Sequence, residues 1–444
     1  MKIIKTVLIF FFCSGLISAE SQQKQLWTIE QCIDYAYRNS PTLALAGLNV
    51  EGQDSTLLNL RSKFDPKLTH SQTYRVEDKQ HISNTSLNTK VYGGFDIGSS
   101  FGSRTTQDTG TKSSSFSLSL SKTILGGASF TAEEIALISG EIEHLKVMNN
   151  FNDTKRRLRY QIAQAFYTVI RNKNTLSIQK LRLKQAEKNL EHALLREEPL
   201  DIASAKVQLP ARKISVESTE KSLQLSIDSL KLLIGKEIHE KLNLDTSFEY
   251  QPINSSLDNS IKNGLEHDVN LMNLKLTLKL QKDQISNAKE GIWPKIKLNA
   301  TMSDSKSGDS DFWELKKTYS QSIGVSINYS LFQKSRKSAL KTARINSDKT
   351  KINIFQRQQE RTKTIKELWL QMQEEKKNIA LQEQVIKVSE MRLNLFKDRW
   401  ENGEIDILEV IRSENEFQNF KVELIKLKTF YMSNLAKYNY YLGN

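Results

Sequence analysis

Histidines are the residues of this chain best suited to binding a metal ion or moving a proton near neutral pH. The sequence contains six of them, at His70, His81, His144, His192, His239 and His267. No two share the spacing of metal ligands on one helix face. The chain also has no phosphate-binding Walker loop and no dinucleotide fingerprint. We therefore expect neither an enzyme nor a cofactor.

The N-terminus has the features of a secretory signal peptide. Two lysines, Lys2 and Lys5, precede an apolar run from Thr6 to Ile17, which the small residues Ser18 and Ala19 follow. This order predicts a signal peptide over residues 1–19. The competing interpretation is a lipoprotein anchor at Cys13, which is disfavoured because Phe10–Phe12 stand where lipoprotein signals need small residues.

Removal of such a peptide leaves Cys32 as the only cysteine. No intramolecular disulfide is then available, so stability must come from packing. Cys32 lies in an amphipathic stretch with Trp27, Ile29, Ile33 and Ala36, which predicts a buried, inert thiol.

The formal net charge of +13 raises the question of nucleic acid. The lysines and arginines are interspersed with glutamates and glutamines, as on solvated helix faces. No zinc-finger, RNP-like or helix-turn-helix pattern accompanies them. Nucleic acid is therefore not an expected partner, whereas an anionic lipid surface or an anionic cargo remains open.

An internal duplication organises the chain. Residues 29–68 align without a gap on a segment 228 positions later, so that Ile33 matches Ile261 and Pro66 matches Pro294. Further on the offset is 207, between Ser117 and Gly324, and then 208 between Gly235 and Gly443. The sequence thus predicts a first structural repeat over 20–237 and a second over 238–444.

The drop in offset from 228 to 207 means that the first repeat carries about 21 extra residues between Pro66 and Leu118. We interpret this insertion as a longer external loop. Each repeat is expected to run helix, two strands, long helix, helix, with its strands at about 67–125 in the first repeat and about 295–332 in the second.

The predicted strands alternate apolar residues with small or polar ones. The clearest stretch runs from Ser322 to Leu331, with apolar residues at Ile323, Val325, Ile327, Tyr329 and Leu331. Alternation over about ten residues is typical of a membrane barrel strand, although a half-buried strand of a soluble protein gives the same pattern. Four strands per chain are too few to close a barrel, so the residues themselves favour an oligomer that pools strands.

The remaining sequence is helical. From about Ala128 to Glu197 there is no proline and Gly140 is the only glycine, and about Arg336 to Glu401 contains neither. At about 1.5 Å per residue, each helix would extend roughly 100 Å. Helices of that length must pack side by side with others. Each ends at a short break, Glu197-Glu198-Pro199 or Asn402-Gly403, before a second helix.

With these features the sequence resembles the TolC family of outer-membrane efflux and secretion channels, from Trp27 to Asn444. The matching segments are Trp27–Ile33, Asn39-Ser40-Pro41, Phe64-Asp65-Pro66, Trp293-Pro294, Tyr329–Phe332 and Gly403–Ile411. No single segment is diagnostic, but their order together with the duplication is specific.

The resemblance implies a mainly α fold with a transmembrane β-barrel portion. Three chains would supply twelve strands, four each, and twelve long helices would continue the barrel as a periplasmic tunnel. It further implies a passive exit channel in the outer membrane that serves an efflux pump or a type I secretion system. The partners would be a periplasmic adaptor and an inner-membrane RND or ABC transporter.

The resemblance also suggests site residues. Asp201 and Glu409 match positions where the family places lumen-facing acids, although Asp201 and Asp406 are equally suited to cap the helices that follow. Trp400 matches an aromatic gate residue of the best-characterised member. Ile405 replaces that member's gate arginine and Arg412 replaces a second acid, so its gate bonds do not transfer to this chain.

The adaptor would dock on two tip turns, Arg196–Ala203 and Trp400–Leu408. The candidate docking residues within them are Glu197, Pro199, Leu200, Gly403, Ile405 and Asp406. The alternative function is that of a periplasmic coiled-coil adaptor or scaffold without a pore. The alternating strands discriminate between the two, because a scaffold needs no lipid-facing sheet.

Overall fold

A computed structural model of the chain describes residues 26–127, 130–197, 199–245, 247, 250, 252–253, 255–308 and 316–443. The predicted signal peptide, with Cys13, lies outside these residues. No helix among the described residues has both the length and the apolar character needed to cross a membrane.

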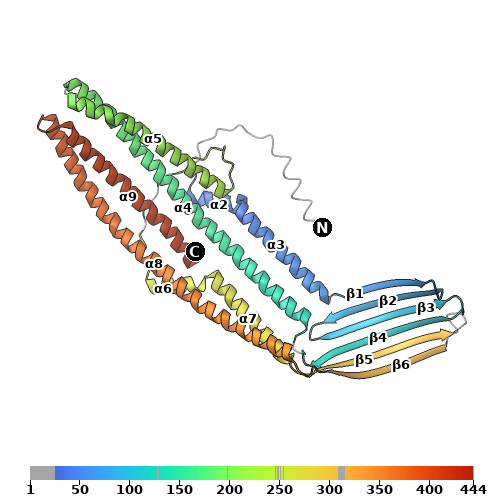
Figure 1. Cartoon of the computed structure of the whole chain (residues 1–444). Coiled ribbons are helices and arrows are strands. Elements are labelled where there is room, and N and C mark those ends of the chain that lie inside the picture. Colours follow the sequence, from blue (N-terminus) through green and yellow to red (C-terminus); the bar gives the residue numbers. More distant parts are fainter. Residues whose placement is uncertain are drawn as a thin grey trace. The chain divides into compact units, whose positions relative to one another are not determined.

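In the first part of the chain, helices precede and follow four strands (Figure 1). In order, these elements are α2 (Ile29–Asn39), α3 (Pro41–Arg61), the 3₁₀ turn η1 (Ser62–Phe64), β1 (Lys67–Arg75), β2 (Gln80–Val91), β3 (Phe95–Thr106), β4 (Lys112–Leu125), α4 (Ala132–Arg196) and α5 (Pro199–Ile234).

The second part has the same order with only two strands. It comprises α6 (Leu257–Glu266), α7 (Val269–Glu290), β5 (Lys295–Gly308), β6 (Lys316–Asn328), α8 (Lys334–Glu401) and α9 (Ile407–Leu442). The mainly helical fold with an antiparallel sheet is thus confirmed. Both long helices, α4 and α8, end within a few residues of their predicted limits, because no proline or glycine interrupts α8 and only Gly140 lies within α4.

Two compact units divide the described chain, and neither follows the repeat boundary. One contains the chain up to Ser40 with Leu158–Ile253 and Gln373–Ala436. The other contains Pro41–Arg157, Asn254–Met372 and the C-terminal residues from Lys437, and it includes the whole sheet. Each unit therefore combines segments from both halves of the sequence.

The prediction of four strands per chain is wrong, because the described residues form six. They make one antiparallel sheet in the order β1-β2-β3-β4-β5-β6. The segment interpreted as a long external loop instead forms the inner strands β2 and β3, which pair over twelve residues each. The alternation of apolar and polar residues in β2 is hard to detect. One face of this strand carries only two apolar residues, Leu87 and Val91, among threonines, serines and a histidine.

The unit that contains the tips of the long helices has an apolar core. Ile162, Phe166, Val169 and Ile170, which recur at three- and four-residue steps along α4, are all buried there. In contrast Leu181 and Leu194, which follow the same periodicity, are exposed. A helix that packs on one side only leaves part of its apolar surface uncovered in a single chain.

Glycines fix equivalent helix junctions in the two halves of the chain. Gly235, just after α5, has φ +79°, and a methyl group there would lie 2.2 Å from the Asn39 carbonyl oxygen. Gly443, just after α9, has φ +91°, and a methyl group there would lie 2.4 Å from the His267 side chain. Asn39 and His267 are themselves 228 positions apart. Only glycine tolerates both the left-handed backbone and this close approach.

Asp268 provides the buried charge of the junction between α6 and α7. It is 1% exposed, and its carboxylate accepts the Leu271 backbone N–H at 2.9 Å as the N-cap of α7. The same carboxylate pairs with Arg357 at 2.9 Å and Arg361 at 3.3 Å, both on α8. Arg361 also donates to the Tyr441 carbonyl oxygen at 2.7 Å, so one carboxylate links α7, α8 and the end of α9.

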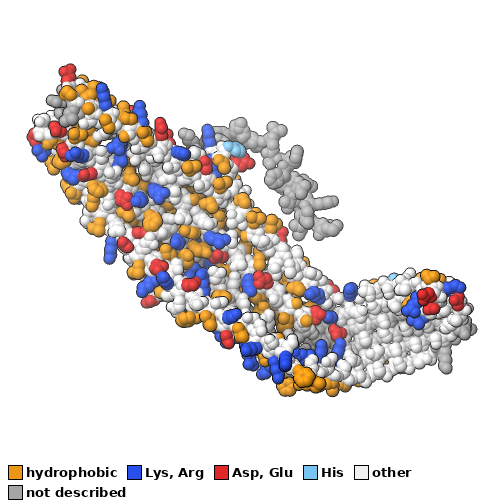
Figure 2. Space-filling model, viewed as in Figure 1, with side chains coloured by type: hydrophobic (Ala, Val, Ile, Leu, Met, Phe, Trp, Pro, Cys, Tyr) orange, Lys and Arg blue, Asp and Glu red, His pale blue; other side chains and the backbone are white. Residues whose placement is uncertain are grey.

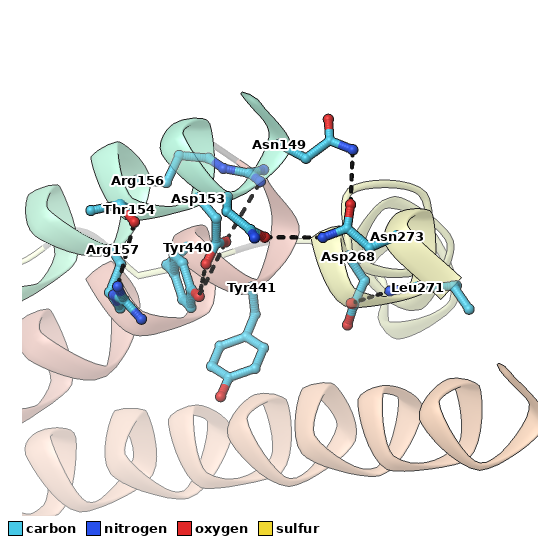
Figure 3. Close-up of polar contacts among 12 residues, drawn as sticks. Asn149, Asp153, Thr154, Arg156, Arg157, Asp268, Leu271, Asn273, Tyr440 and Tyr441 are labelled. Carbon is cyan, nitrogen blue, oxygen red and sulfur yellow. Dashed lines mark hydrogen bonds and ion pairs between the residues drawn. The ribbon is translucent and has the colours of Figure 1, made fainter. Parts of the chain in front are cut away.

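Neighbouring polar contacts tie α4 into the same unit (Figure 3). The Tyr440 hydroxyl donates to Asp153 at 3.2 Å, and Asn149 donates to Asn273 at 3.0 Å. Burial, reinforced by the nearby Asp153 carboxylate, raises the pKa of Tyr440 to about 12. The phenol therefore remains a hydrogen-bond donor throughout the physiological pH range.

Cys32 is buried as predicted, and burial followed by the charge of Glu30 raises its thiol pKa to about 12. Since the thiolate is the reactive form, we expect no maleimide labelling of the native protein at pH 8. Denaturation in urea should expose one thiol per chain if the signal peptide has been removed and two if Cys13 is retained. Labelling of the native protein, counted by mass spectrometry, would contradict the burial.

Substitution Asp268→Ala should lower the free energy of unfolding by about 3–5 kcal/mol, because it leaves two arginines without their buried counter-charge. Loss of helical circular dichroism in urea measures the effect. The matched control is Asp258→Ala, since Asp258 is an exposed acid in the first turn of α6. The control should change the free energy by at most about 0.5 kcal/mol. Equal effects of the two substitutions would refute the role assigned to Asp268.

Candidate functional site

One face of the sheet is apolar. The register of the six strands places alternate residues on a common side. Those on this side include Leu68, Leu87, Val91, Phe95, Ile97, Phe101, Phe116, Leu118, Leu120, Leu298, Met302, Ile323, Val325 and Ile327. Most of these side chains are exposed in the single chain. Exposed apolar surface of this extent indicates a membrane or protein environment.

The opposite face, here called the hydroxyl face, consists of the other alternate residues of β1–β6. On β4 it presents Ser113, Ser115, Ser117, Ser119 and Ser121, and serine, threonine and asparagine continue it across β5 and β6. Ile82 is its one large apolar residue between Lys67 and Thr123. The part of the sheet visible in Figure 2 carries few hydrophobic side chains.

Cross-strand hydrogen bonds organise the hydroxyl face. Ser100 and Ser117 share a bond at 2.7 Å, as do Ser303 and Ser320. At Gly98 an added methyl group would lie 2.7 Å from the Asn88 amide oxygen. Glycine there leaves room for neighbouring polar side chains to reach across the strand.

A literal G-x-S-x-G sequence, the nucleophile motif of many hydrolases, occurs at Gly98–Gly102. It lies in the middle of β3, whereas the hydrolase motif requires a sharp turn from strand to helix. Ser100 bonds to Ser117, and no histidine contacts it in the described part of the chain. The match therefore arises from the alternation of small residues in a strand.

The first tip turn joins α4 to α5. Glu197 has φ +58°, and Pro199 opens α5 with Asp201 in its first turn. Asp201 is 9% exposed, so in the single chain it does not present an open carboxylate. The side chains of Arg196 and Leu200 lie outside the described part, and the docking role of Leu200 stays a prediction.

The second tip turn joins α8 to α9. Gly403 has φ +77°, and Arg399 pairs with Glu404 across the turn at 3.0 Å. Ile405 lies in the turn itself, and Ile407 begins α9 fully buried. The Asp406 carbonyl accepts the Glu409 N–H at 3.1 Å, which is a backbone contact and not a side-chain cap.

The predicted gate residues are only partly brought together. Glu409 pairs with Arg412 at 2.9 Å along α9. Trp400 instead contacts His192 of α4, with ring centroids 5.9 Å apart and the rings nearly perpendicular. His192 and Arg399 were missed by sequence reasoning, because a charged or aromatic residue near a helix end gives no signal of its partner on another helix.

A polar layer interrupts the apolar core among α4, α5, α8 and α9. It lines a cavity of 290 Å³ that includes Arg182, Asn189, Arg212 and Glu414. Glu414 accepts from Asn189 at 3.4 Å and pairs with Lys397 at 3.1 Å. Burial, and then the charge of Arg212, lowers the pKa of Arg182. Polar residues at core-facing helical positions were the signal that could have identified this layer.

The described residues contain no group of three or more histidine, cysteine, aspartate or glutamate side chains arranged to hold a metal ion. The tips and the sheet present charged groups, hydrogen-bonding groups and apolar side chains. Such surfaces can bind a partner, line a passage or gate it.

Known proteins share this architecture. The family model described as "Outer membrane efflux protein" matches residues 261–444. Comparison with curated protein sequences finds no match. Among solved structures, CusC is similar with a TM-score of 0.71 and 16% identity, over 94% of this chain and 92% of that one.

Two further solved structures have nearly the same similarity. The outer membrane protein VceC of Vibrio cholerae matches with a TM-score of 0.69 and 15% identity, over 94% of this chain and 96% of that one. The MtrE outer membrane channel of Neisseria gonorrhoeae matches with a TM-score of 0.69 and 16% identity, over 94% and 89%. The resemblance to the TolC family is thereby confirmed: residues 261–444 match the outer membrane efflux protein family, and the chain has the fold of the solved outer-membrane channels.

Proposed function

We propose that this chain is the outer-membrane exit channel of a tripartite efflux pump or a type I secretion system. Three copies would form one continuous passage, with the sheets in the membrane and the long helices in the periplasm. The observation that carries the proposal is the division of the sheet into an apolar face and a hydroxyl face. Lipid on one side and water on the other is the environment that such a sheet requires.

The open edges of the sheet support pooling of strands between copies. Each of β1 and β6 pairs with one neighbour only. Strands β1 and β6 run in opposite directions, so β6 of one copy can continue the antiparallel order onto β1 of the next. Three copies of six strands would give eighteen, and barrels of about 16–18 strands enclose an aqueous channel.

The helices support the same assembly. Apolar side chains remain exposed along α4 and α5, among them Leu181, Leu194, Leu195, Val207 and Ile214. In a closed ring of helices, neighbouring copies would cover such residues. The tip turns at 196–203 and 400–408 would remain free at the end of the tunnel to receive a periplasmic adaptor, which in turn would contact an RND or ABC transporter in the inner membrane.

The predicted acids take a modified role in this proposal. With three copies, Glu409 and Arg412 would form alternating charges near the entrance instead of a purely acidic ring. Asp201 would lie buried in the packing of the helices and would not present an open carboxylate at the entrance. The alternative of a periplasmic scaffold has no use for the apolar sheet face.

The native mass of the protein extracted from purified outer membranes in mild detergent tests the assembly. We expect a complex of three chains that falls to one chain after heating in strong detergent, which serves as the control. A single-chain mass, or protein found only in the soluble periplasmic fraction, would refute the channel and leave the scaffold function.

Substitution Arg412→Ala should increase the preference of the reconstituted channel for cations, because it leaves the carboxylate of Glu409 without its partner. The reversal potential in a salt gradient across a planar bilayer measures this preference. Lys426→Ala is the matched control, since Lys426 forms the same kind of pair with Glu423 farther along α9. No shift with Arg412→Ala, or an equal shift with the control, would exclude Glu409 from the entrance.

A further inference from the structure

The register of the sheet assigns its charged residues to faces, which the sequence alone does not do. Among the strand residues whose side chains the structure describes, six cationic residues lie on the hydroxyl face, and Asp96 is the acid on that face. The six are Lys67, Arg75, Lys90, Arg104, Lys295 and Lys297. The hydroxyl face is therefore strongly cationic.

Two of the six cations are neutralised by acids. Lys297 pairs with Asp96 at 3.2 Å, and Lys90 pairs with Glu133 at the start of α4. The other four, Lys67, Arg75, Arg104 and Lys295, are exposed and form no ion pair within the described ranges. Each copy therefore leaves four uncompensated positive charges on this face.

These four charges lie toward the two ends of the sheet. Lys67 and Lys295 are the first residues of β1 and β5, next to the helices. Arg75 is the last residue of β1, and Arg104 lies near the same end of β3. Between them the face presents uncharged hydroxyl and amide groups, which interact with a hydrated solute without selecting a charge.

We propose that the barrel lumen favours anions, so that the cargo of this channel consists of hydrated anionic solutes. The inference rests on the proposed function, since it requires a pore with the hydroxyl face inward. Three copies would place six uncompensated cations toward each mouth of the barrel. Rings of lysine and arginine favour anions in pores, and low-dielectric walls strengthen the field of such rings.

Charges on the apolar face supply a comparison within the same sheet. Lys122 lies over the Phe95 ring, 4.1 Å from its centroid, on β4. Lys306 of β5 belongs to the same face, near the other end of the sheet. These lysines would face lipid and its head groups instead of the lumen, so their charge should have little effect on the permeating ions.

The test compares two double variants of the full-length protein that remove the same charge. Arg104→Gln with Lys295→Gln removes one lumen cation near each end of the barrel. Lys122→Gln with Lys306→Gln removes one cation near each end of the apolar face. Both variants and the wild type are reconstituted in planar bilayers, and the Cl⁻/K⁺ permeability ratio is obtained from the reversal potential in a KCl gradient.

We expect a wild-type preference for Cl⁻, a ratio lowered about two- to threefold in the lumen variant, and an unchanged ratio in the apolar-face variant. A wild-type channel that prefers K⁺ overturns the inference, and so does a lumen variant with the wild-type ratio. A native trimer that conducts with either of these results leaves the proposed function intact. A protein that forms no trimer and carries no current contradicts the proposed function itself.

Discussion

The unpaired backbone along β1 and β6 is the constraint on which the rest of this structure depends. Four inner strands bond on both sides, whereas the two edge strands each have one neighbour. Each unpaired backbone group in hydrocarbon costs several kcal/mol. Ile323 on β6 is 82% exposed, against 44% for Leu120 in the interior of the sheet. A long edge without proline or a bulge is suited to pairing with another strand, which is why the proposed channel needs more than one copy of the chain.

Within each helix, the backbone N–H and C=O groups bond to one another. The helices therefore need no partner for their backbone, unlike the edge strands. Their apolar stripes need neighbours, and the two compact units provide only some of them. Within each unit, a helix junction is fixed by a glycine that lets two backbones approach, at Gly235 and again at Gly443. In the second half of the chain a buried carboxylate, Asp268, reinforces the junction, where the first half has Ser40 at the equivalent position. The two halves thus keep the same glycine-fixed junction, whereas the residue beside it is a serine in the first half and an aspartate in the second.

Several elements were predictable from local pattern. The second long helix, α8, runs from Lys334 to Glu401, close to the predicted 336–401, because sixty-eight residues without proline or glycine can adopt little else. The buried state of Cys32 followed from the amphipathic stretch around it. The extra hairpin β2–β3 was not predictable, since its strands are too polar for alternation to stand out. The partners of Trp400 and Glu414 were not predictable either, because they come from helices distant in the sequence.

The sequence by itself determined the periodicity of each segment, and with it the helices, the alternating strands, the duplication and the resemblance to outer-membrane channels. These follow from local chemistry, since proline, glycine and the spacing of apolar residues act within a few positions of themselves. Only the tertiary structure decided how many strands pair, which cations share the face of Ser117 and Ser119, and that Trp400 contacts His192. Those properties depend on strand register and helix packing, in which a shift of one residue moves every side chain to the other face.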